Sequence, residues 1–230
     1  RKIYNFFKYK NMDAILLSAG IGSRTGLKYP KQFLSINGKP MLVYSLEVLR
    51  RCKEIDKIVV TCTQDYLEVY QGYIEKYHIN DVHCVLGGST RQESVRLALE
   101  YVNTEKVMVH EAARPLISVD FVESVLAVKN EVAVVPTIPV KFTVVEGGIY
   151  MEKELIRSCL HNIQLPQVFD THILYDAHQE AVRDGYVATE DGMLVFHYGH
   201  KVRFIEGRES NIKVTTMLDI EIVEKLLKLS

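Results

Sequence analysis

The sequence has few cysteines, no long apolar run and almost no net charge, and each of these features excludes a class of protein. The four cysteines form no CxxC pair and have no metal-ligand spacing, which is typical of reduced thiols in an intracellular protein rather than of a zinc module or a disulfide framework. No apolar run approaches the roughly 18 residues that a membrane span needs. A formal net charge of -1 argues against a general nucleic-acid or membrane-surface binder. We therefore expect a cytoplasmic protein that binds neither nucleic acid nor membrane.

The length and composition are those of a soluble α/β enzyme. The chain has 230 residues, of which 47% are hydrophobic and 25% charged, enough for one large domain with a substantial core. Residues 1–11 are basic and aromatic but carry no separate apolar region and no cleavage site, so we expect a poorly ordered extension there. A single domain is then predicted over residues 12–230.

Apolar runs and helical patterns alternate along most of the chain. Strands that alternate with helices through short loops predict a doubly wound, mostly parallel sheet. A different pattern at 140–155 indicates a β-hairpin with Gly147-Gly148 at its turn; because such a ribbon buries little within one chain, we expect it to pack on a partner subunit. The expected strands are 14–17, 57–63, 83–86, 107–110, 132–136 and 201–206, and the expected helices are about 40–51, 66–77, 91–101, 121–128, 171–184, 191–196 and 218–229.

The first of these strands ends in a segment that suits a phosphate chain. The apolar residues 14–17 are followed by the small residues 18–23, whose consecutive backbone amides can form a concave anion nest. Two cations follow, Arg24 and Lys31, and Pro30 stiffens the approach to the second. The segment lacks the closing Gly-Lys-Ser/Thr of a P-loop and the third glycine of a dinucleotide fingerprint. An ordinary strand-to-helix turn would also need small residues, but the Pro-Lys-Gln sequence favours a nucleoside triphosphate site.

A second glycine-rich segment follows the third expected strand. Gly87-Gly88 would let a flat ligand approach the backbone, and Arg91 and Ser94 share one face of the helix that begins there. The carboxyl ends of the strands are where α/β sheets bind ligands, so this segment and the first loop should lie together. An ordinary turn before a capped helix explains the same pattern.

Three other places carry isolated charges. In the segment 110–115, HEAARP, Glu111 and Arg114 suit a sugar hydroxyl or a metal-bridged phosphate, or else form a solvated salt pair. Lys213 alternates with apolar neighbours and should face the cleft if its segment is extended. Arg157, after the hairpin, is either a further site cation or a surface arginine.

Four motifs occur in order along the chain, AGxGxR with PKQ, GGxxRxxS, HEAARP and NIKVTT, and LPQ stands at residues 165–167. With them, the chain from Met12 onward resembles the 2-C-methyl-D-erythritol 4-phosphate cytidylyltransferases and the related ribitol-5-phosphate cytidylyltransferases. The resemblance implies a Rossmann-like nucleotidyltransferase fold whose hairpin arm, at about 138–160, embraces a second subunit of a homodimer. It also implies an EC 2.7.7-type transferase that uses CTP and Mg²⁺, attaches CMP to a small polyol phosphate and releases pyrophosphate.

The resemblance also implies roles for the residues at matching positions. Arg24 and Lys31 would stabilise the pentacoordinate transition state, and Arg157 and Lys213 would hold the incoming phosphate, Arg157 across the subunit interface. Glu111, where the family usually has aspartate, would lie close to the ribose and the metal. The acceptor would meet Arg114, Val140, Leu165 and Thr189. CTP would contact Leu17, Ser18, Ala19, Gly20, Ile21, Gly22, Ser23, Gly87, Gly88, Arg91, Ser94, Glu111 and Ala112.

The acceptor side departs from the family pattern at two positions. Val140 and Leu165 stand where the family commonly has threonine, and an apolar side chain cannot hydrogen-bond a substrate hydroxyl. We therefore expect methylerythritol phosphate, which carries a methyl branch, as the acceptor for isoprenoid precursor synthesis; ribitol phosphate is the alternative. Two other hypotheses stay open: a CTP-binding dimer that has lost its chemistry, and a sugar-1-phosphate nucleotidyltransferase, against which HEAARP and NIKVTT argue.

Overall fold

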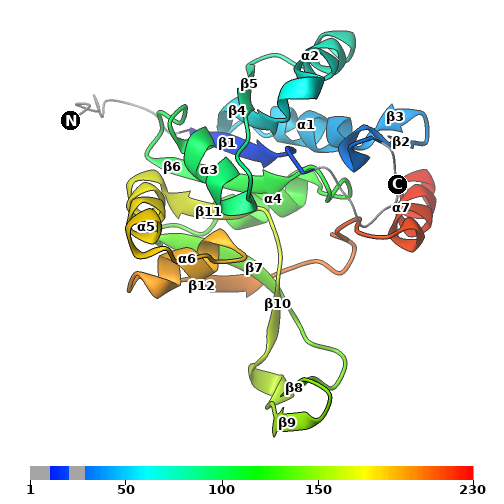
Figure 1. Cartoon of the computed structure of the whole chain (residues 1–230). Coiled ribbons are helices and arrows are strands. Elements are labelled where there is room, and N and C mark those ends of the chain that lie inside the picture. The colour runs from blue at the N-terminus through cyan, green and yellow to red at the C-terminus, as the bar shows by residue number, and fades with distance from the viewer. Residues whose placement is uncertain (1–10, 21–28, 230) are drawn as a thin grey trace.

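The computed structural model describes residues 11–20 and 29–229, and its centre is an eight-stranded sheet with the order β5-β4-β1-β6-β11-β7-β10, to which β12 is added beside β7 (Figure 1). β5, β4, β1 and β6 run parallel to one another, as β12 does to β7, whereas β10 and β11 are antiparallel to their neighbours. The strands are β1 (Met12–Leu17), β4 (Ile55–Cys62), β5 (Val82–Leu86), β6 (Lys106–Glu111), β7 (Ala133–Pro139), β10 (His161–Ile163), β11 (Gln167–Asp170) and β12 (Arg203–Glu206).

Helices cover both faces of the sheet because neighbouring residues of its buried strands point to opposite sides. In β1, Ala14 and Leu16 belong to one buried cluster, whereas Ile15 and Leu17 belong to another. This arrangement confirms the predicted doubly wound α/β fold with a parallel core. The first cluster is covered by α1 (Met41–Arg51), α2 (Leu67–Lys76) and α4 (Val119–Leu126), and the second by α3 (Arg91–Leu99), α5 (Thr171–Asp184) and α6 (Asp191–His197).

The sequence pattern does not predict β10 and β11. Both pair with β7, with Ile163 opposite Thr137 and Val168 opposite Val134. Segments of three and four residues are too short to show the alternation that identifies a strand, and their partners lie elsewhere in the chain. Together they make the sheet mixed. A small hairpin of β2 (Ser35–Ile36) and β3 (Lys39–Pro40) is also absent from the expected elements.

The predicted hairpin is present as an arm that projects from the body of the molecule (Figure 1). It consists of β8 (Val145–Gly147) and β9 (Met151–Glu154), which pair antiparallel. Its apolar side chains face solvent in the single chain: Ile149 is 94% exposed, and Phe142 and Tyr150 are both 82% exposed. That the arm packs on a partner subunit stays a prediction.

The parallel strands β1, β4 and β6 end at the same edge of the sheet, where the last segment of the chain also arrives. Val214 donates its backbone N–H to the carbonyl of Ala113, just after β6, over a distance of 2.8 Å. The closing helix α7 (Met217–Leu229) then packs against β2. No helix among the described residues is both long enough and apolar enough to cross a membrane.

Candidate active site

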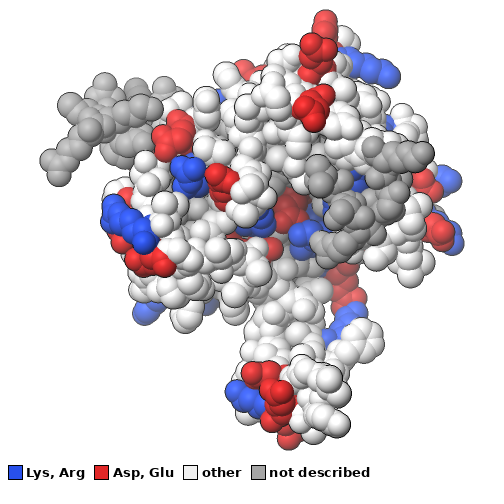
Figure 2. Space-filling model, viewed as in Figure 1, with Lys and Arg blue, Asp and Glu red and all other residues white. Residues whose placement is uncertain are grey.

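A cavity of about 620 Å³ lies at this edge of the sheet, which is a typical size for a small-molecule site. Figure 2 shows acidic and basic side chains side by side in the hollow above the arm. Segments from seven places along the chain converge on the cavity, as the parallel topology predicts. Of the residues expected from the sequence, those that line it are Leu17, Ser18, Ala19, Gly20, Lys31, Gly88, Arg91, Ser94, Glu111, Ala112 and Lys213. Ile21, Gly22, Ser23 and Arg24 lie outside the described residues.

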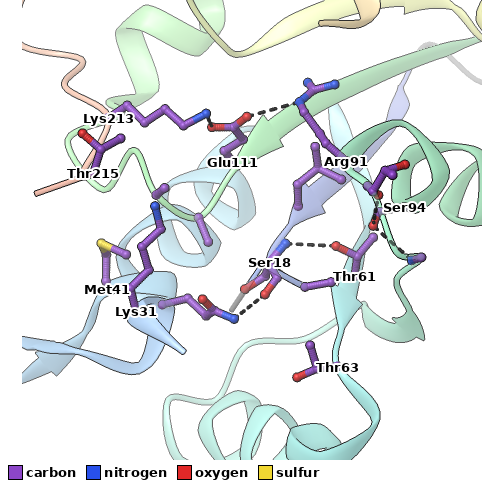
Figure 3. A pocket seen from close by; sticks show the side chains of 18 of the residues that line it. Ser18, Lys31, Met41, Thr61, Thr63, Arg91, Ser94, Glu111, Lys213 and Thr215 are labelled. Atoms are coloured by element: carbon purple, nitrogen blue, oxygen red, sulfur yellow. Dashed lines mark hydrogen bonds and ion pairs between the residues drawn. The ribbon is translucent and has the colours of Figure 1, made fainter. Parts of the chain in front are cut away.

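The end of β1 is held on both sides by its neighbours. The Ser18 N–H donates to the Thr61 hydroxyl of β4 at 2.9 Å, and the Leu17 carbonyl accepts from the Ala112 N–H, after β6, at 3.0 Å. Figure 3 shows Ser18 and Thr61 joined at the floor of the cavity. The start of the predicted phosphate loop is therefore placed by the sheet itself. Thr61 and Thr63, which line the cavity, are not among the residues expected from the sequence.

The two lysines expected to be catalytic reach the cavity from opposite ends of the chain. Lys31 lies in a 3-10 turn, Lys31–Phe33, and its Nζ donates to the Val214 carbonyl at 2.8 Å. The Nζ of Lys213 lies 2.7 Å from a carboxylate oxygen of Glu111. Both lysines point into one space in Figure 3. Because repulsion between cations must be offset, the Glu111 carboxylate allows two ammonium groups to share this cavity before an anionic ligand binds.

Arg91 carries the densest charge cluster of the site. Its guanidinium nitrogens lie 3.3 Å from Glu111, 3.0 Å from Glu190 and 2.8 Å from Asp191, so three carboxylates surround it. Burial acts to lower the pKa of Arg91, but Asp191, Glu190 and Glu111 together raise it above its ordinary value. Arg91 therefore stays charged. Glu190 and Asp191 lie beside Thr189 in the sequence, and no local pattern there indicates that they contact a helix a hundred residues earlier.

The three carboxylates around Arg91 differ in their protonation. Burial acts to raise the pKa of Glu111, yet Lys213 and Arg91 hold it below its usual range. Burial likewise opposes ionisation of Asp191, but Arg91 and the His178 ring, 3.1 Å away, lower its pKa to about 2. The pKa of Glu190 is instead raised, by burial and by the two neighbouring carboxylates. Glu111 and Asp191 are thus anionic, and Glu190 is the carboxyl that takes up a proton most readily.

The second glycine-rich segment packs closely on the first loop, as expected. A Cβ on Gly87 would collide with the side chain of Ala19, and a Cβ on Gly88 would collide with Glu93. The Ser94 hydroxyl accepts from the Gly88 N–H at 3.1 Å and donates to the Thr90 carbonyl at 2.8 Å. These bonds fix the backbone at 88–90 as one wall of the cavity. Ser94 therefore lines the cavity, as expected, and its hydroxyl also fixes the backbone of Gly88 and Thr90.

The residues expected at the acceptor do not line the cavity of the single chain. Arg114 is buried and donates to the Asn211 carbonyl at 2.8 Å, which places it behind the Lys213 segment. Leu165 is fully buried in the core, and only its carbonyl takes part in a polar contact, with the Asn211 side chain at 2.5 Å. Thr189 is exposed at the start of α6.

Val140 and Arg157 belong to the arm. Val140 is half-buried at its base, where its N–H donates to the Leu160 carbonyl at 3.4 Å. Arg157 is exposed, and its guanidinium donates to the Lys141 carbonyl at 3.2 Å. Neither side chain lines the cavity of its own chain.

This combination of cations and a glycine-containing wall agrees with the result of comparing the chain with known proteins. The family model described as 2-C-methyl-D-erythritol 4-phosphate cytidylyltransferase (IspD) matches residues 12–229. The chain belongs to this family. Its members carry the cytidylyltransferase activity that makes CDP-methylerythritol for isoprenoid precursor synthesis, and the chain is an enzyme of that class, EC 2.7.7.60. The predicted family, fold class and enzyme class are confirmed, and of the two acceptors considered the comparisons support methylerythritol phosphate.

Individual relatives of the IspD family agree over nearly the whole chain. The chloroplastic 2-C-methyl-D-erythritol 4-phosphate cytidylyltransferase of Oryza sativa is 37% identical over 226 residues, 96% of this chain and 75% of the relative. The Clostridium kluyveri enzyme is 35% identical over 95% of this chain and 97% of its own. Among solved structures, the 4-diphosphocytidyl-2C-methyl-D-erythritol synthase of Anaerococcus prevotii superposes with a TM-score of 0.83 at 28% identity, covering 96% of this chain and all of that one.

Proposed function

We propose that the cavity binds CTP with its triphosphate along residues 18–20 and between the two lysines, Lys31 and Lys213, and with its cytosine against the wall at 88–94. The observation that carries this proposal is the convergence of Lys31, Lys213 and Arg91 on one cavity of nucleotide size. The two ammonium groups suit the triphosphate, whereas the Arg91 guanidinium, surrounded by three carboxylates, belongs to the side proposed for cytosine. The backbone wall suits a flat base, because Gly88 lines the cavity and the Ser94 hydroxyl holds its N–H in place.

In the proposed reaction a phosphate oxygen of methylerythritol phosphate attacks the α-phosphorus of CTP. A new P–O bond forms, and the bond from that phosphorus to the oxygen bridging to the β-phosphate breaks, so pyrophosphate leaves with the electron pair. Negative charge grows on the oxygens around the α-phosphorus, where Lys31, together with Arg24, would stabilise it. Lys213 would hold the attacking phosphate, since its ammonium group points into the same cavity as that of Lys31 (Figure 3).

Glu111 is the residue that we propose as the protein ligand of Mg²⁺. Among the described residues no group of three or more acidic, histidine or cysteine side chains could hold a metal ion by itself. That fits Mg²⁺ in a nucleotidyltransferase, which is commonly held by one or two carboxylates plus the phosphates of the substrate. When bound, the ion neutralises charge on the triphosphate. Glu111 is ionised and lines the cavity, so its residue type and its protonation state both suit this role.

We also propose that the enzyme is a homodimer in which the arm contributes to the partner's site. The exposed apolar residues Phe142, Ile149 and Tyr150 need a covering surface, and Arg157 lies on the same arm, away from the cavity of its own chain. An Arg157 that reached the partner's cavity would add a cation for the acceptor phosphate. The described cysteines are all free thiols, which supports a reducing, cytoplasmic setting.

The test is pyrophosphate release with CTP, Mg²⁺ and each of two acceptors, methylerythritol phosphate and ribitol 5-phosphate. We expect turnover with the first and a clear preference for it in kcat/KM. UTP, GTP and dTTP in place of CTP should support little or no reaction. CTP binding without release of pyrophosphate would instead support the inactive-protein hypothesis, and a preference for another nucleotide would support a sugar-phosphate nucleotidyltransferase.

A further inference from the structure

The backbone carbonyl of Ser18 accepts hydrogen bonds from two buried side chains, Gln32 and Tyr70. The Tyr70 hydroxyl of α2 donates to this carbonyl at 2.5 Å, and the Gln32 carboxamide nitrogen donates to the same oxygen. Gln32 also donates to the Tyr70 hydroxyl at 2.9 Å. Tyr70 is fully buried and Gln32 is 3% exposed. We call Ser18, Gln32 and Tyr70 the Ser18 cluster.

The direction of the Ser18 carbonyl decides where the next amide points. A peptide unit is planar and trans, so its C=O and the N–H of the following residue point in opposite directions. Two donors hold the Ser18 oxygen towards Tyr70 in the interior, and the Ala19 N–H therefore points away from Tyr70. Ala19 lines the cavity, at the start of the predicted anion nest. The Ser18 cluster thus aims a backbone donor.

The same cluster reaches the turn that carries Lys31. Gln32 is the next residue along the chain, so its bonds to Ser18 and Tyr70 join the 3-10 turn to the end of β1. Phe33, which ends that turn, packs against Tyr70 with ring centroids 4.9 Å apart and against Tyr73 at 5.8 Å. Packing therefore places the turn on α2, and the hydroxyl of Tyr70 adds a directional link between turn and loop.

We propose that the Tyr70 hydroxyl and the Gln32 carboxamide are positioning groups for CTP: they hold the Ala19 N–H and the Lys31 side chain in one fixed relation across the triphosphate. The inference rests on the proposed placement of CTP and extends it to two buried groups that act through the backbone, of which Gln32 also lines the cavity. Neither side chain could supply a proton or a nucleophile to the cavity, because both are buried and already hydrogen-bonded to each other. Their effect is on the geometry of the donors.

Tyr70→Phe tests the proposal because it keeps the ring that packs on Phe33 and removes only the hydroxyl. We expect the KM for CTP to rise about fivefold and kcat to fall about tenfold, with the KM for methylerythritol phosphate unchanged, since only the triphosphate contacts are misaligned. Tyr73→Phe is the matched control: it makes the same chemical change on the same helix, next to the same phenylalanine. Its constants should stay within about twofold of wild type.

Gln32→Met provides the second variant, with similar side-chain length and no hydrogen-bonding group. We expect the same rise in the KM for CTP. The KM of the double variant should be at most about twice that of the more impaired single variant, because both substitutions release the same Ser18 carbonyl. Thermal unfolding of each variant shows whether the folded state persists at the assay temperature. A purely structural role would lower the midpoint while leaving both KM values at wild-type levels, and that result would overturn the proposal.

Failure of this inference and failure of the proposed function give different results. If wild type and Tyr73→Phe release pyrophosphate normally and Tyr70→Phe matches them, the positioning role is wrong and the reaction stands. If wild type releases no pyrophosphate from CTP with either acceptor, the proposed function itself is wrong.

Discussion

Single charged residues define the cavity, and each is held by a partner of opposite charge or by a backbone carbonyl. Lys213 contacts Glu111 at 2.7 Å, Glu111 contacts Arg91 at 3.3 Å, and Lys31 donates to the Val214 carbonyl at 2.8 Å. Incoming phosphates can replace these contacts, because a phosphate accepts from ammonium and guanidinium groups more strongly than a neutral carbonyl does. The site is therefore already arranged for an anion.

Lys31→Ala should lower kcat by about 10²-fold, because it removes a cation from the oxygens on which charge develops in the transition state. The measurement is the rate of pyrophosphate release at saturating CTP and acceptor. Lys39→Ala is the control, since Lys39 pairs with Glu47 at 2.6 Å and does not line the cavity. Equal rates for the two variants would show that Lys31 has no part in the chemical step.

Asp191→Asn should make stability less dependent on pH. The pKa of Asp191 is lowered to about 2, chiefly by Arg91 against the opposing effect of burial, so its charge stabilises the folded state above the unfolded pKa and this stabilisation is lost as pH falls. In wild type the free energy of unfolding should fall by on the order of 2 kcal/mol between about pH 4 and pH 2 from this group alone. Urea titrations at several pH values measure this.

The Asp191→Asn variant should also have a lower free energy of unfolding at neutral pH, by roughly 3 kcal/mol, because Arg91 and His178 lose a buried charged partner. Asp65→Asn changes an exposed carboxylate in the same way and should leave the pH profile unaltered. If the profile of Asp191→Asn ran parallel to that of wild type, the lowered pKa would be contradicted.

Among the elements, α7 fixes the end of the segment that carries Lys213, through hydrogen bonds from its first turn. The Asp219 carboxylate accepts from the N–H and the hydroxyl of Thr215 at 2.8 and 2.9 Å, and from those of Thr216 at 2.7 and 2.9 Å. Asp219 returns its own N–H to the Thr216 hydroxyl at 3.3 Å, which completes a capping box at the first turn of the helix. The two threonines of the NIKVTT motif therefore end the active-site segment and begin the helix.

Asp219→Ala should lower the free energy of unfolding by about 1 kcal/mol, the usual cost of a lost helix cap. It should also raise the KM for methylerythritol phosphate severalfold, because Lys213 loses part of its backbone support. Glu221→Ala, an exposed change in the same helix, is the control for both measurements. A loss of stability without any change in KM would limit the role of Asp219 to the helix.

At the scale of the whole molecule, the arm stands out because its apolar side chains Phe142, Ile149 and Tyr150 are exposed in the described part of the single chain. Tyr150→Asp or Ile149→Asp should shift the protein towards monomer, because each places a charge in the interface that we propose for the exposed tip. Sedimentation velocity gives the oligomeric state, and turnover should fall together with the dimer fraction if Arg157 serves the partner's site. Val187→Asp, at an apolar residue that is 74% exposed outside the arm, should change neither. A wild-type monomer with full activity would contradict the dimer proposal.

The sequence by itself determined the features that depend on near neighbours along the chain. The apolar run in β1, the glycines before α3, the hairpin and most helices follow from local spacing, because strand and helix periods repeat within a few residues. The order of the motifs was sufficient to indicate the family. The expectation that Lys31, Arg91, Glu111 and Lys213 meet was possible because parallel strands end at one edge of a sheet.

Tertiary structure alone decided which distant side chains touch. No local pattern shows that Glu190 and Asp191 enclose Arg91, that Tyr70 reaches the Ser18 carbonyl, or that Leu165 lies in the core. The residues in contact lie far apart along the chain, from 46 positions for Leu165 and Asn211 to 100 positions for Arg91 and Asp191. They are set by how helices pack on each face of the sheet, and packing depends on side-chain shape across the whole core rather than on spacing along the chain.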